Sequence, residues 1–201
     1  MEMAQHFVLA CQIMTTVIDM VPKAKRCQNG DDLFMEIKRY SWITTSRNTD
    51  DVCPIFRRTF SAGKTVLSAS LTITALGVYR AVLNGSPVGD FVLAPGWTSY
   101  DNRLQVQVYD VTSLLTDENE LCVTIGRGWF RSPLPGWINS KDKQRRVAQP
   151  CGLIACLKIQ YEDGTAETLS TDTDWTWAES PVRFSEIYDG ERVDARVIPD
   201  D

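Results

Sequence analysis

The dipeptide Asn84-Gly85 lies between two apolar runs, residues 78–83 and 87–93, and it sets the strongest local constraint on the chain. Asn-Gly suits a type I′ turn because both central residues of that turn must adopt positive φ. We therefore predict a β-hairpin across these two runs, with Asn84 and Gly85 serving only as its turn.

Further strands are predicted on both sides of this hairpin. Residues 66–76 alternate apolar and polar side chains, with Leu71 and Ile73 on one face and Thr72 and Thr74 on the other, which is the pattern of a half-buried strand. Turn-forming residues separate the remaining segments at intervals of about 8–12 residues. The expected strands are 36–43, 55–60, 66–76, 78–83, 87–93, 104–109, 119–125, 151–161, 165–169 and 175–177.

Helical signals are short. Asp110 can cap a short turn at 111–115, and the sequence Gly-Arg-Gly-Trp at 126–129 is interpreted as a bulge or corner. No long amphipathic segment is visible. The predicted fold class is all-β: a two-sheet antiparallel β-sandwich, jelly-roll-like, with short helical turns only.

The chain is long enough for one domain, since 201 residues with 43% hydrophobic content can bury a sizeable core. We place that domain at residues 35–201 and treat residues 1–34 as an N-terminal extension, either a short helix or disordered. The apolar run 7–21 is interrupted by Gln12 and Asp19 and follows no basic residues. This run therefore lacks the features of a secretory signal peptide and those of a membrane-spanning segment.

Charge and cysteine content limit the classes of partner. The net charge is −5, and Lys and Arg are scattered rather than clustered, which argues against a nucleic-acid-binding protein. The six cysteines are widely spaced and His6 is the only histidine, so a Cys/His metal site and a histidine-dependent triad are not expected. We interpret the cysteines as mostly buried, reduced thiols and expect a cytoplasmic location.

Five blocks of sequence occur in a fixed order: ITALGVYRAVLNGSPVGD, LAPGWTSYDNR, VYDVTSLL, NELCVTIGRGW and SEIYDGERVDAR. In order and spacing they resemble the N-terminal domain of bacterial α-L-rhamnosidases, over residues 35–196. The resemblance implies a β-sandwich ahead of a catalytic (α/α)₆ barrel that removes terminal α-L-rhamnose with inversion. In that family the acid and base carboxylates lie in the barrel.

The resemblance therefore implies a non-catalytic accessory domain that helps to recognise or position terminal α-L-rhamnosides for a barrel absent from this chain. Inverting hydrolysis needs two carboxyl groups roughly 6.5–9.5 Å apart. We assign no catalytic residue, because each available carboxylate also has a turn or cap explanation. The expected partners are rhamnose-containing glycans or glycosides and the barrel, with no nucleic acid and no membrane.

Candidate sugar-binding residues gather in the loop that follows the hairpin and in a second loop. Aromatic faces pack on the C–H side of a sugar ring, and short polar side chains bond its hydroxyls. Trp97 has an alternative interpretation as a plug at the end of the sandwich. The candidates are Trp97, Tyr100, Asp101, Asn102, Arg103 and Trp129.

Calcium is the only candidate cofactor. The resemblance implies it in relatives that bind rhamnose, and Asp101 and Asn102 carry the oxygen ligands that this ion prefers. The C-terminal block has a different expected role, which is contact with the missing barrel or a neighbouring sheet. Its residues are Tyr188, Asp189, Glu191 and Asp194.

Three alternatives remain open. The chain could be an autonomous rhamnose-binding module that uses calcium. It could also be the sugar-binding sandwich of a β-galactosidase-like enzyme, which shares the Asn-Gly hairpin and the Asp-Val-Thr turn, although the blocks LAPGWTSY and YDGERVDAR favour a rhamnosidase. A purely structural domain would instead show a contiguous apolar patch near the C-terminal block and no sugar affinity.

Overall fold

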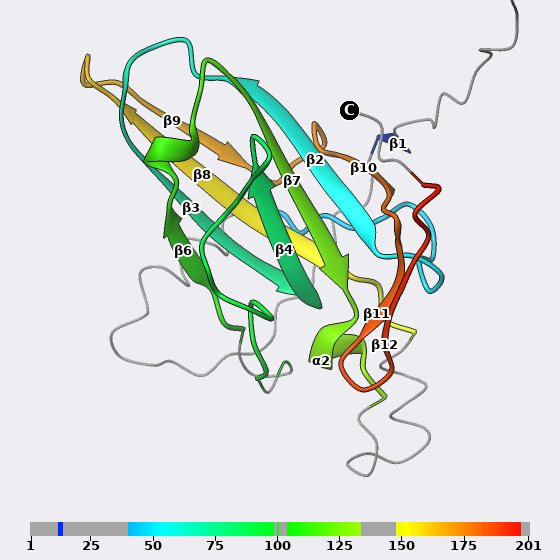
Figure 1. The fold of residues 1–201 in the computed structure, drawn as a ribbon. Coiled ribbons are helices and arrows are strands. Elements are labelled where there is room, and N and C mark those ends of the chain that lie inside the picture. The colour runs from blue at the N-terminus through cyan, green and yellow to red at the C-terminus, as the bar shows by residue number, and fades with distance from the viewer. Residues whose placement is uncertain (1–11, 14–39, 99, 101–103, 134–147, 198–201) are drawn as a thin grey trace, which may run out of the picture.

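The computed structural model describes residues 12–13, 40–98, 100, 104–133 and 148–197. They form two antiparallel sheets packed face to face and a separate hairpin (Figure 1), which confirms the predicted all-β sandwich. The six-stranded sheet has the order β1 (Gln12–Ile13), β10 (Thr176–Glu179), β2 (Pro54–Ser61), β7 (Glu118–Gly126), β4 (Val78–Leu83) and β5 (Ser86–Pro87). The four-stranded sheet has the order β6 (Gln107–Asp110), β3 (Val66–Leu76), β8 (Gly152–Tyr161) and β9 (Ala166–Ser170). The hairpin pairs β11 (Val182–Glu186) with β12 (Gly190–Val193).

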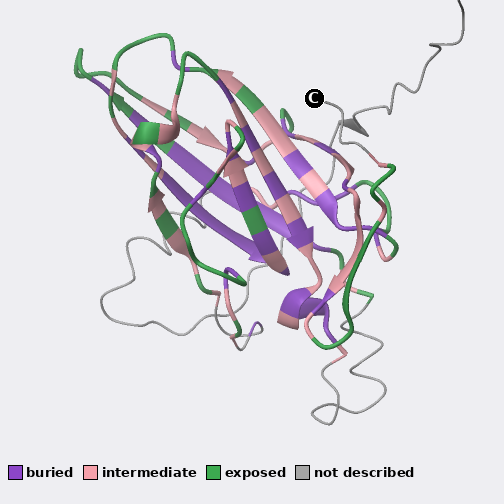
Figure 2. Cartoon of the chain, in the orientation of Figure 1, coloured by how far each residue is buried: buried purple, intermediate pink, exposed green. Residues whose placement is uncertain are grey.

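The core lies between the two sheets because their strands alternate inward apolar and outward polar residues. In β7, Leu121, Val123 and Ile125 are buried, while the residues between them are half-buried. Buried residues run along β3, β7 and β8 in Figure 2. Each buried aliphatic side chain contributes about 1.5–3 kcal/mol relative to an exposed one. The largest fully buried apolar side chains are Phe56, Leu71, Ile73, Leu83, Val111, Val123, Ile125, Leu153, Ile154 and Ile159.

The prediction for β3 is wrong in its second half, where the strand is buried on both faces. Thr72 and Thr74 are buried like the apolar residues between them. Thr74 donates its hydroxyl hydrogen to the Gln105 carbonyl at 2.6 Å. The segment that carries Gln105 therefore covers the face that the alternation assigned to solvent.

The predicted strand at 87–93 is also wrong, because β5 ends at Pro87 and is followed by one further bond to β4, from the Val88 N–H to the Ala81 carbonyl at 3.0 Å. Gly89 and Leu93 adopt φ values of 67° and 60°, which no regular strand contains. A Cβ atom at Gly89 would lie 2.3 Å from the Tyr109 ring, so the chain turns away at a position that only glycine can occupy.

The sequence Gly-Arg-Gly-Trp, predicted as a bulge or corner, contains the end of β7 and the start of a helical turn. This turn is α2 (Gly128–Arg131), and Gly128 begins it at φ 52°. A Cβ atom there would lie 2.7 Å from the Val78 backbone nitrogen. The close approach of α2 to β4 thus requires glycine at this position.

The Asn84-Gly85 turn is confirmed, with φ values of 52° and 77°. Asn84 has a further role, however, since its amide joins the hairpin to its neighbours. Its Nδ2 donates to the Leu114 carbonyl and to Asn119 Oδ1, both at 2.8 Å, and its Oδ1 accepts the backbone N–H of Glu120 at 2.8 Å. The side chain therefore ties the turn to β7 and to the 3₁₀ turn η1 (Thr112–Leu114).

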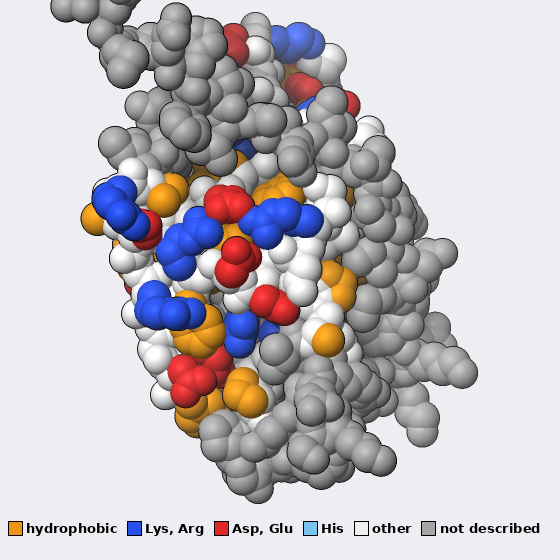
Figure 3. All heavy atoms as spheres, turned by 90° about the vertical axis from the view of Figure 1, so that its right-hand side faces the viewer, with side chains coloured by type: hydrophobic (Ala, Val, Ile, Leu, Met, Phe, Trp, Pro, Cys, Tyr) orange, Lys and Arg blue, Asp and Glu red, His pale blue; other side chains and the backbone are white. Residues whose placement is uncertain are grey.

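Other expectations have mixed outcomes. Two residues of the expected N-terminal extension form β1, and the rest of residues 1–34 lies outside the described residues. No helix in the described part of the chain is long and apolar enough to cross a membrane. Acidic and basic side chains are interspersed on the face shown in Figure 3. The Glu179 carboxylate, for example, forms ion pairs with both Arg47 and Arg183.

Candidate functional site

The loop after β5 is anchored to the sandwich by backbone hydrogen bonds. Tyr79 at the start of β4 donates its N–H to the Ala94 carbonyl at 2.7 Å. Gly96 donates its N–H to the Leu93 carbonyl at 3.0 Å and closes a tight turn, with φ values of 60° at Leu93 and 96° at Gly96. Trp97 follows this turn directly, so a fixed backbone positions its ring.

Two glutamines, one just before β6 and one at its start, hold the same loop. Gln105 donates its side-chain N–H to the Trp97 carbonyl at 2.7 Å, and Gln107 donates to the Pro95 carbonyl at 3.1 Å. A Cβ atom at Gly96 would lie 3.1 Å from Gln105 Oε1, so the glycine permits this close approach. Neither glutamine is predicted as a site residue, because their period-2 spacing indicates only a wet strand face.

Trp97 and Trp129 form a stacked aromatic pair at one end of the sandwich. Their ring centroids are 6.4 Å apart and their planes differ by 8°. Trp97 is 50% exposed, so it does not plug the end of the sandwich. Trp129 is half-buried and packs beside Leu76 and Phe130. Two loops that are separate candidates in the sequence thus build one apolar surface.

Tyr100, another predicted sugar-binding residue, is buried. Its ring packs edge-on against Phe130, with centroids 5.2 Å apart and an interplanar angle of 77°. Its hydroxyl donates to the Gly96 carbonyl at 3.1 Å. Tyr100 therefore stabilises the turn that carries Trp97, and its ring offers little surface to a ligand.

The predicted polar residues Asp101, Asn102 and Arg103 lie outside the described residues. No cluster of three or more His, Cys, Asp or Glu side chains suited to a metal ion occurs among the residues that the structure describes. Oxygen donors such as Asp101 and Asn102 fit calcium by their chemistry. The described part of the candidate site thus consists of the aromatic pair Trp97–Trp129 and the hydrogen bonds that hold the Trp97 loop.

The predicted interface residues lie on the hairpin β11–β12 or just after it. Tyr188 is half exposed, Asp189 belongs to the turn, and Glu191 is exposed on β12. Asp194 instead binds Arg196, with Nη2 and Oδ2 2.8 Å apart, and this guanidinium lowers the pKa of Asp194 to about 2. Asp194 therefore has a local partner, whereas Tyr188 and Glu191 are open to solvent.

Glu186 is a functional candidate that is absent from the sequence-based predictions. It is only 5% exposed, and its Oε2 accepts the backbone N–H groups of Tyr188 at 2.7 Å and Asp189 at 2.9 Å. Its Oε1 is buried and has no hydrogen-bond partner within the described part of the chain. A glutamate just before an Asp-Gly turn is common on protein surfaces, so no sequence signal marks its burial.

The fold and its anchored loop define an all-β sandwich domain with an exposed aromatic pair at one end. Residues 64–201 match the family described as the alpha-L-rhamnosidase N-terminal domain. An alpha-L-rhamnosidase of Alteromonas sp. (strain LOR) is 36% identical over 157 residues, which cover 77% of this chain and 16% of that protein. The chain belongs to the α-L-rhamnosidase N-terminal domain family.

Solved structures of rhamnosidases show the same fold. The Streptomyces avermitilis alpha-L-rhamnosidase, complexed with L-rhamnose, superposes with a TM-score of 0.66 at 37% identity and covers 72% of this chain. The native Aspergillus terreus enzyme superposes with a TM-score of 0.71 at 38% identity and covers 80%. This chain spans 14% and 19% of those two proteins, so it is similar to a small part of each.

Proposed function

We propose that this chain is a non-catalytic accessory domain of an α-L-rhamnosidase, and that it recognises or positions terminal α-L-rhamnosides for a catalytic (α/α)₆ barrel. Family membership supports the link to that hydrolase. The observation that carries sugar recognition is the aromatic pair, in which half-exposed Trp97 stacks on Trp129. An indole face packs well against the C–H side of a pyranose ring.

The hydrolytic step belongs, in this proposal, to the remainder of the longer enzyme. Several acidic residues in the described part already have structural partners. Asp163 pairs with Lys64 at 2.8 Å, Asp194 with Arg196, and Asp110 accepts the backbone N–H of Thr112 at 2.9 Å. These three carboxylates serve turns and surface pairs.

An autonomous calcium-assisted rhamnose-binding module is the second candidate. It is favoured by the position of Asp101 and Asn102, which follow Trp97 closely in the sequence. These two residues would hold the ion, and bound calcium would supply a positive centre that coordinates sugar hydroxyls. In this case the domain would bind rhamnose with useful affinity by itself.

Isothermal titration of the purified chain with L-rhamnose, with calcium or with a chelator, tests recognition. We expect Trp97→Ala to weaken binding at least about fivefold, since an aromatic face contributes on the order of 1 kcal/mol or more. Tyr188→Ala removes another half-exposed aromatic ring and should leave binding unchanged. The absence of any binding heat in both buffers would sink the recognition proposal.

Two further measurements separate the alternatives. Galactose binding stronger than rhamnose binding would favour a β-galactosidase-like sandwich. Release of rhamnose from an aryl α-L-rhamnoside by this chain alone would contradict the non-catalytic assignment. Rhamnose binding that persists in the presence of the chelator would be consistent with the accessory role and would show that calcium is not needed for it.

A further inference from the structure

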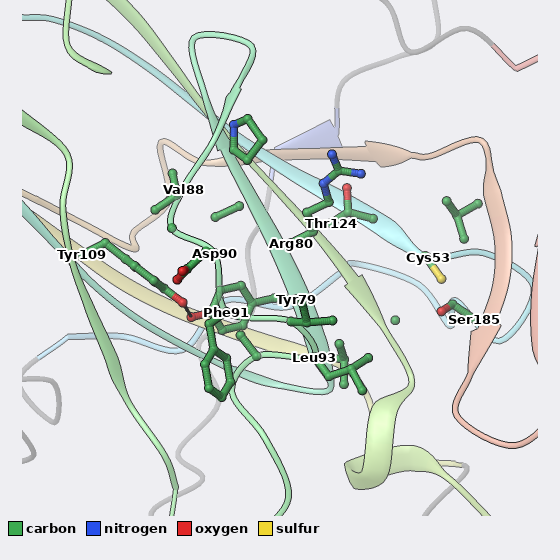
Figure 4. Close-up of a pocket in the computed structure, with 18 of the residues that line it drawn as sticks. Cys53, Tyr79, Arg80, Val88, Asp90, Phe91, Leu93, Tyr109, Thr124 and Ser185 are labelled. Atoms are coloured by element: carbon green, nitrogen blue, oxygen red, sulfur yellow. Dashed lines mark hydrogen bonds between the residues drawn. The ribbon is translucent and has the colours of Figure 1, made fainter. Parts of the chain in front are cut away.

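A groove of about 540 Å³ lies over β4, between loop 88–94 and the segment that carries Ser185 (Figure 4). One wall presents Phe91, Val92 and Leu93, which are 53%, 80% and 45% exposed. Single exposed apolar residues are ordinary, but a contiguous apolar patch beside a groove marks an interaction surface. The wall is therefore a candidate contact for another apolar surface.

A smaller cavity of about 270 Å³ extends this groove toward the hairpin β11–β12. Val78, Leu93, Ser185 and Glu191 line both spaces, so the two form one continuous depression. The smaller cavity is also lined by Glu186. We call the combined depression, with its apolar wall and the hairpin, the docking groove.

The hairpin β11–β12 is unusually exposed for a strand pair in a folded domain. It belongs to neither large sheet, and all residues of β12 are exposed. Tyr188 and Val193 present apolar side chains to solvent. A two-stranded hairpin is marginally stable unless another layer packs on it. The described residues supply no layer on the outer side of β12.

Two carboxylates give this apolar surface a negative side. Glu186 Oε1 is buried and has no hydrogen-bond donor among the described residues, although native proteins rarely leave a buried carboxylate oxygen unpaired. Glu191 contributes a second carboxylate beside the same cavity. Glu191 is exposed, so a partner that fits combines apolar side chains with a donor opposite this carboxylate, and charge complementarity favours the cationic donor of Arg or Lys.

We propose that the docking groove binds the remainder of a longer α-L-rhamnosidase polypeptide, through an apolar segment with an Arg or Lys side chain opposite Glu191. This inference rests on the proposed function, because it takes the chain as one domain of such an enzyme. The relatives support this occupant, since this chain spans only 16% and 12% of two of them. Of the four interface residues predicted from the sequence, this proposal keeps Tyr188 and Glu191. It adds Phe91, Val92 and Glu186, which line the groove.

Hydroxyl-radical footprinting tests the proposal in two proteins. One is the full 201-residue chain, and the other is the Streptomyces avermitilis enzyme with its matching segment, 40% identical over 134 residues, replaced by this chain. We expect labelling of Phe91, Leu93 and Tyr188 to fall at least about threefold in the chimera, because a docked interface excludes water. Leu67, an exposed apolar residue on β3, is the matched control and should label equally in both. Equal labelling of the groove residues would overturn the proposal.

A stability comparison gives a second readout that does not depend on labelling. Val92→Ser should shift the melting temperature of the free chain by less than about 1 °C, because nothing covers this side chain there. In the chimera it should lower the melting temperature of this domain by several degrees. Leu67→Ser should behave alike in both proteins. A Val92→Ser effect that is equally small in both would also overturn the proposal.

Two outcomes distinguish this inference from its rivals. Sedimentation equilibrium that shows a dimer of the free chain, lost in Val92→Ser, would assign the groove to a second copy and overturn the proposal. Rhamnose titration of Val92→Ser should match that of the unaltered chain, because the aromatic pair is untouched. The two proposals can therefore fail separately. An absence of rhamnose binding would not affect the footprinting test of docking, and an absence of docking would not affect the titration test of sugar recognition.

Discussion

The indole rings of Trp97 and Trp129 stack with centroids 6.4 Å apart and planes 8° from parallel, although one ring follows β5 and the other belongs to α2. Each ring is positioned by contacts between its own segment and other parts of the sandwich. Trp97 depends on the anchored turn at Leu93 and Gly96, and Trp129 depends on the close approach of α2 to β4. Changes in either segment should therefore alter the shared surface.

Gln105→Ala should weaken rhamnose binding by about three- to tenfold, because it removes the hydrogen bond to the Trp97 carbonyl and with it the preorganisation of the loop. Titration calorimetry measures the change. Gln160→Ala removes a glutamine whose side chain accepts from Ser68 elsewhere on the four-stranded sheet, and it should leave affinity unchanged. Equal affinities for both variants would show that Gln105 does not position the ring.

Gly128→Ala should lower the free energy of unfolding by about 3 kcal/mol or more, because it combines a strained positive φ with overpacking. The added Cβ would lie 2.7 Å from the Val78 nitrogen. Gly63→Ala is the control, since its Cβ would meet nothing within 4 Å. Urea unfolding measures both, and a Gly128→Ala chain as stable as the control would contradict the packing of α2 on β4.

Asn84→Gly should destabilise the chain by about 2 kcal/mol, since glycine accepts the turn conformation but leaves the partners of the amide unpaired. Gly85→Ala provides the contrast. Its Cβ would meet no neighbour, so only the strain of positive φ remains, at about 1–2 kcal/mol. If the Asn84→Gly chain had unchanged stability in urea, the hydrogen bonds of the Asn84 amide would contribute nothing and only its turn conformation would matter.

Stability should fall with rising pH through the titration of Cys53. Burial, and then the nearby charge of Glu191, raise the pKa of this thiol from 9.0 to about 11. The unfolded chain loses the thiol proton first, so the contribution of the protonated thiol is complete below pH 9 and is lost as the pH rises toward 11. Urea midpoints at several pH values measure the slope.

The Cys53→Ala variant separates this thiol from the other groups that titrate in the same range. Its stability should fall less steeply between pH 9 and 11, whatever its stability at neutral pH. Cys122 on β7 is a second such thiol, because burial raises its pKa to about 11 as well. Identical slopes for Cys53→Ala and the unaltered chain would contradict the burial of Cys53.

Much of the sandwich follows from local patterns. Apolar runs bounded by turn residues predict the bounds of β2, β3, β7 and β8 to within a few residues, because strand and turn preferences are local properties. The Asn84-Gly85 turn follows from the positive φ of both residues, which is also a local requirement. The family resemblance, carried by ordered blocks, is confirmed by the match over residues 64–201.

Tertiary contacts decided the rest. The segment 88–93 has the composition of a strand, but Tyr109 and the Ala94 carbonyl bond to Tyr79 hold it as a loop. The hairpin β11–β12 is not predicted as strands: the family block begins at Ser185, inside β11, and β12 does not alternate in polarity. Local pattern cannot show what a neighbouring segment will cover.

The sequence by itself determined the fold class, the central turn and the family, since these depend on periodicity, φ preference and motif order. Only the tertiary structure decided that Trp97 meets Trp129, that Tyr100 is buried, and that Glu186 has an oxygen with no partner among the described residues. These features depend on distances between segments far apart in the chain. They arise when the sheets pack, which no single stretch of sequence encodes.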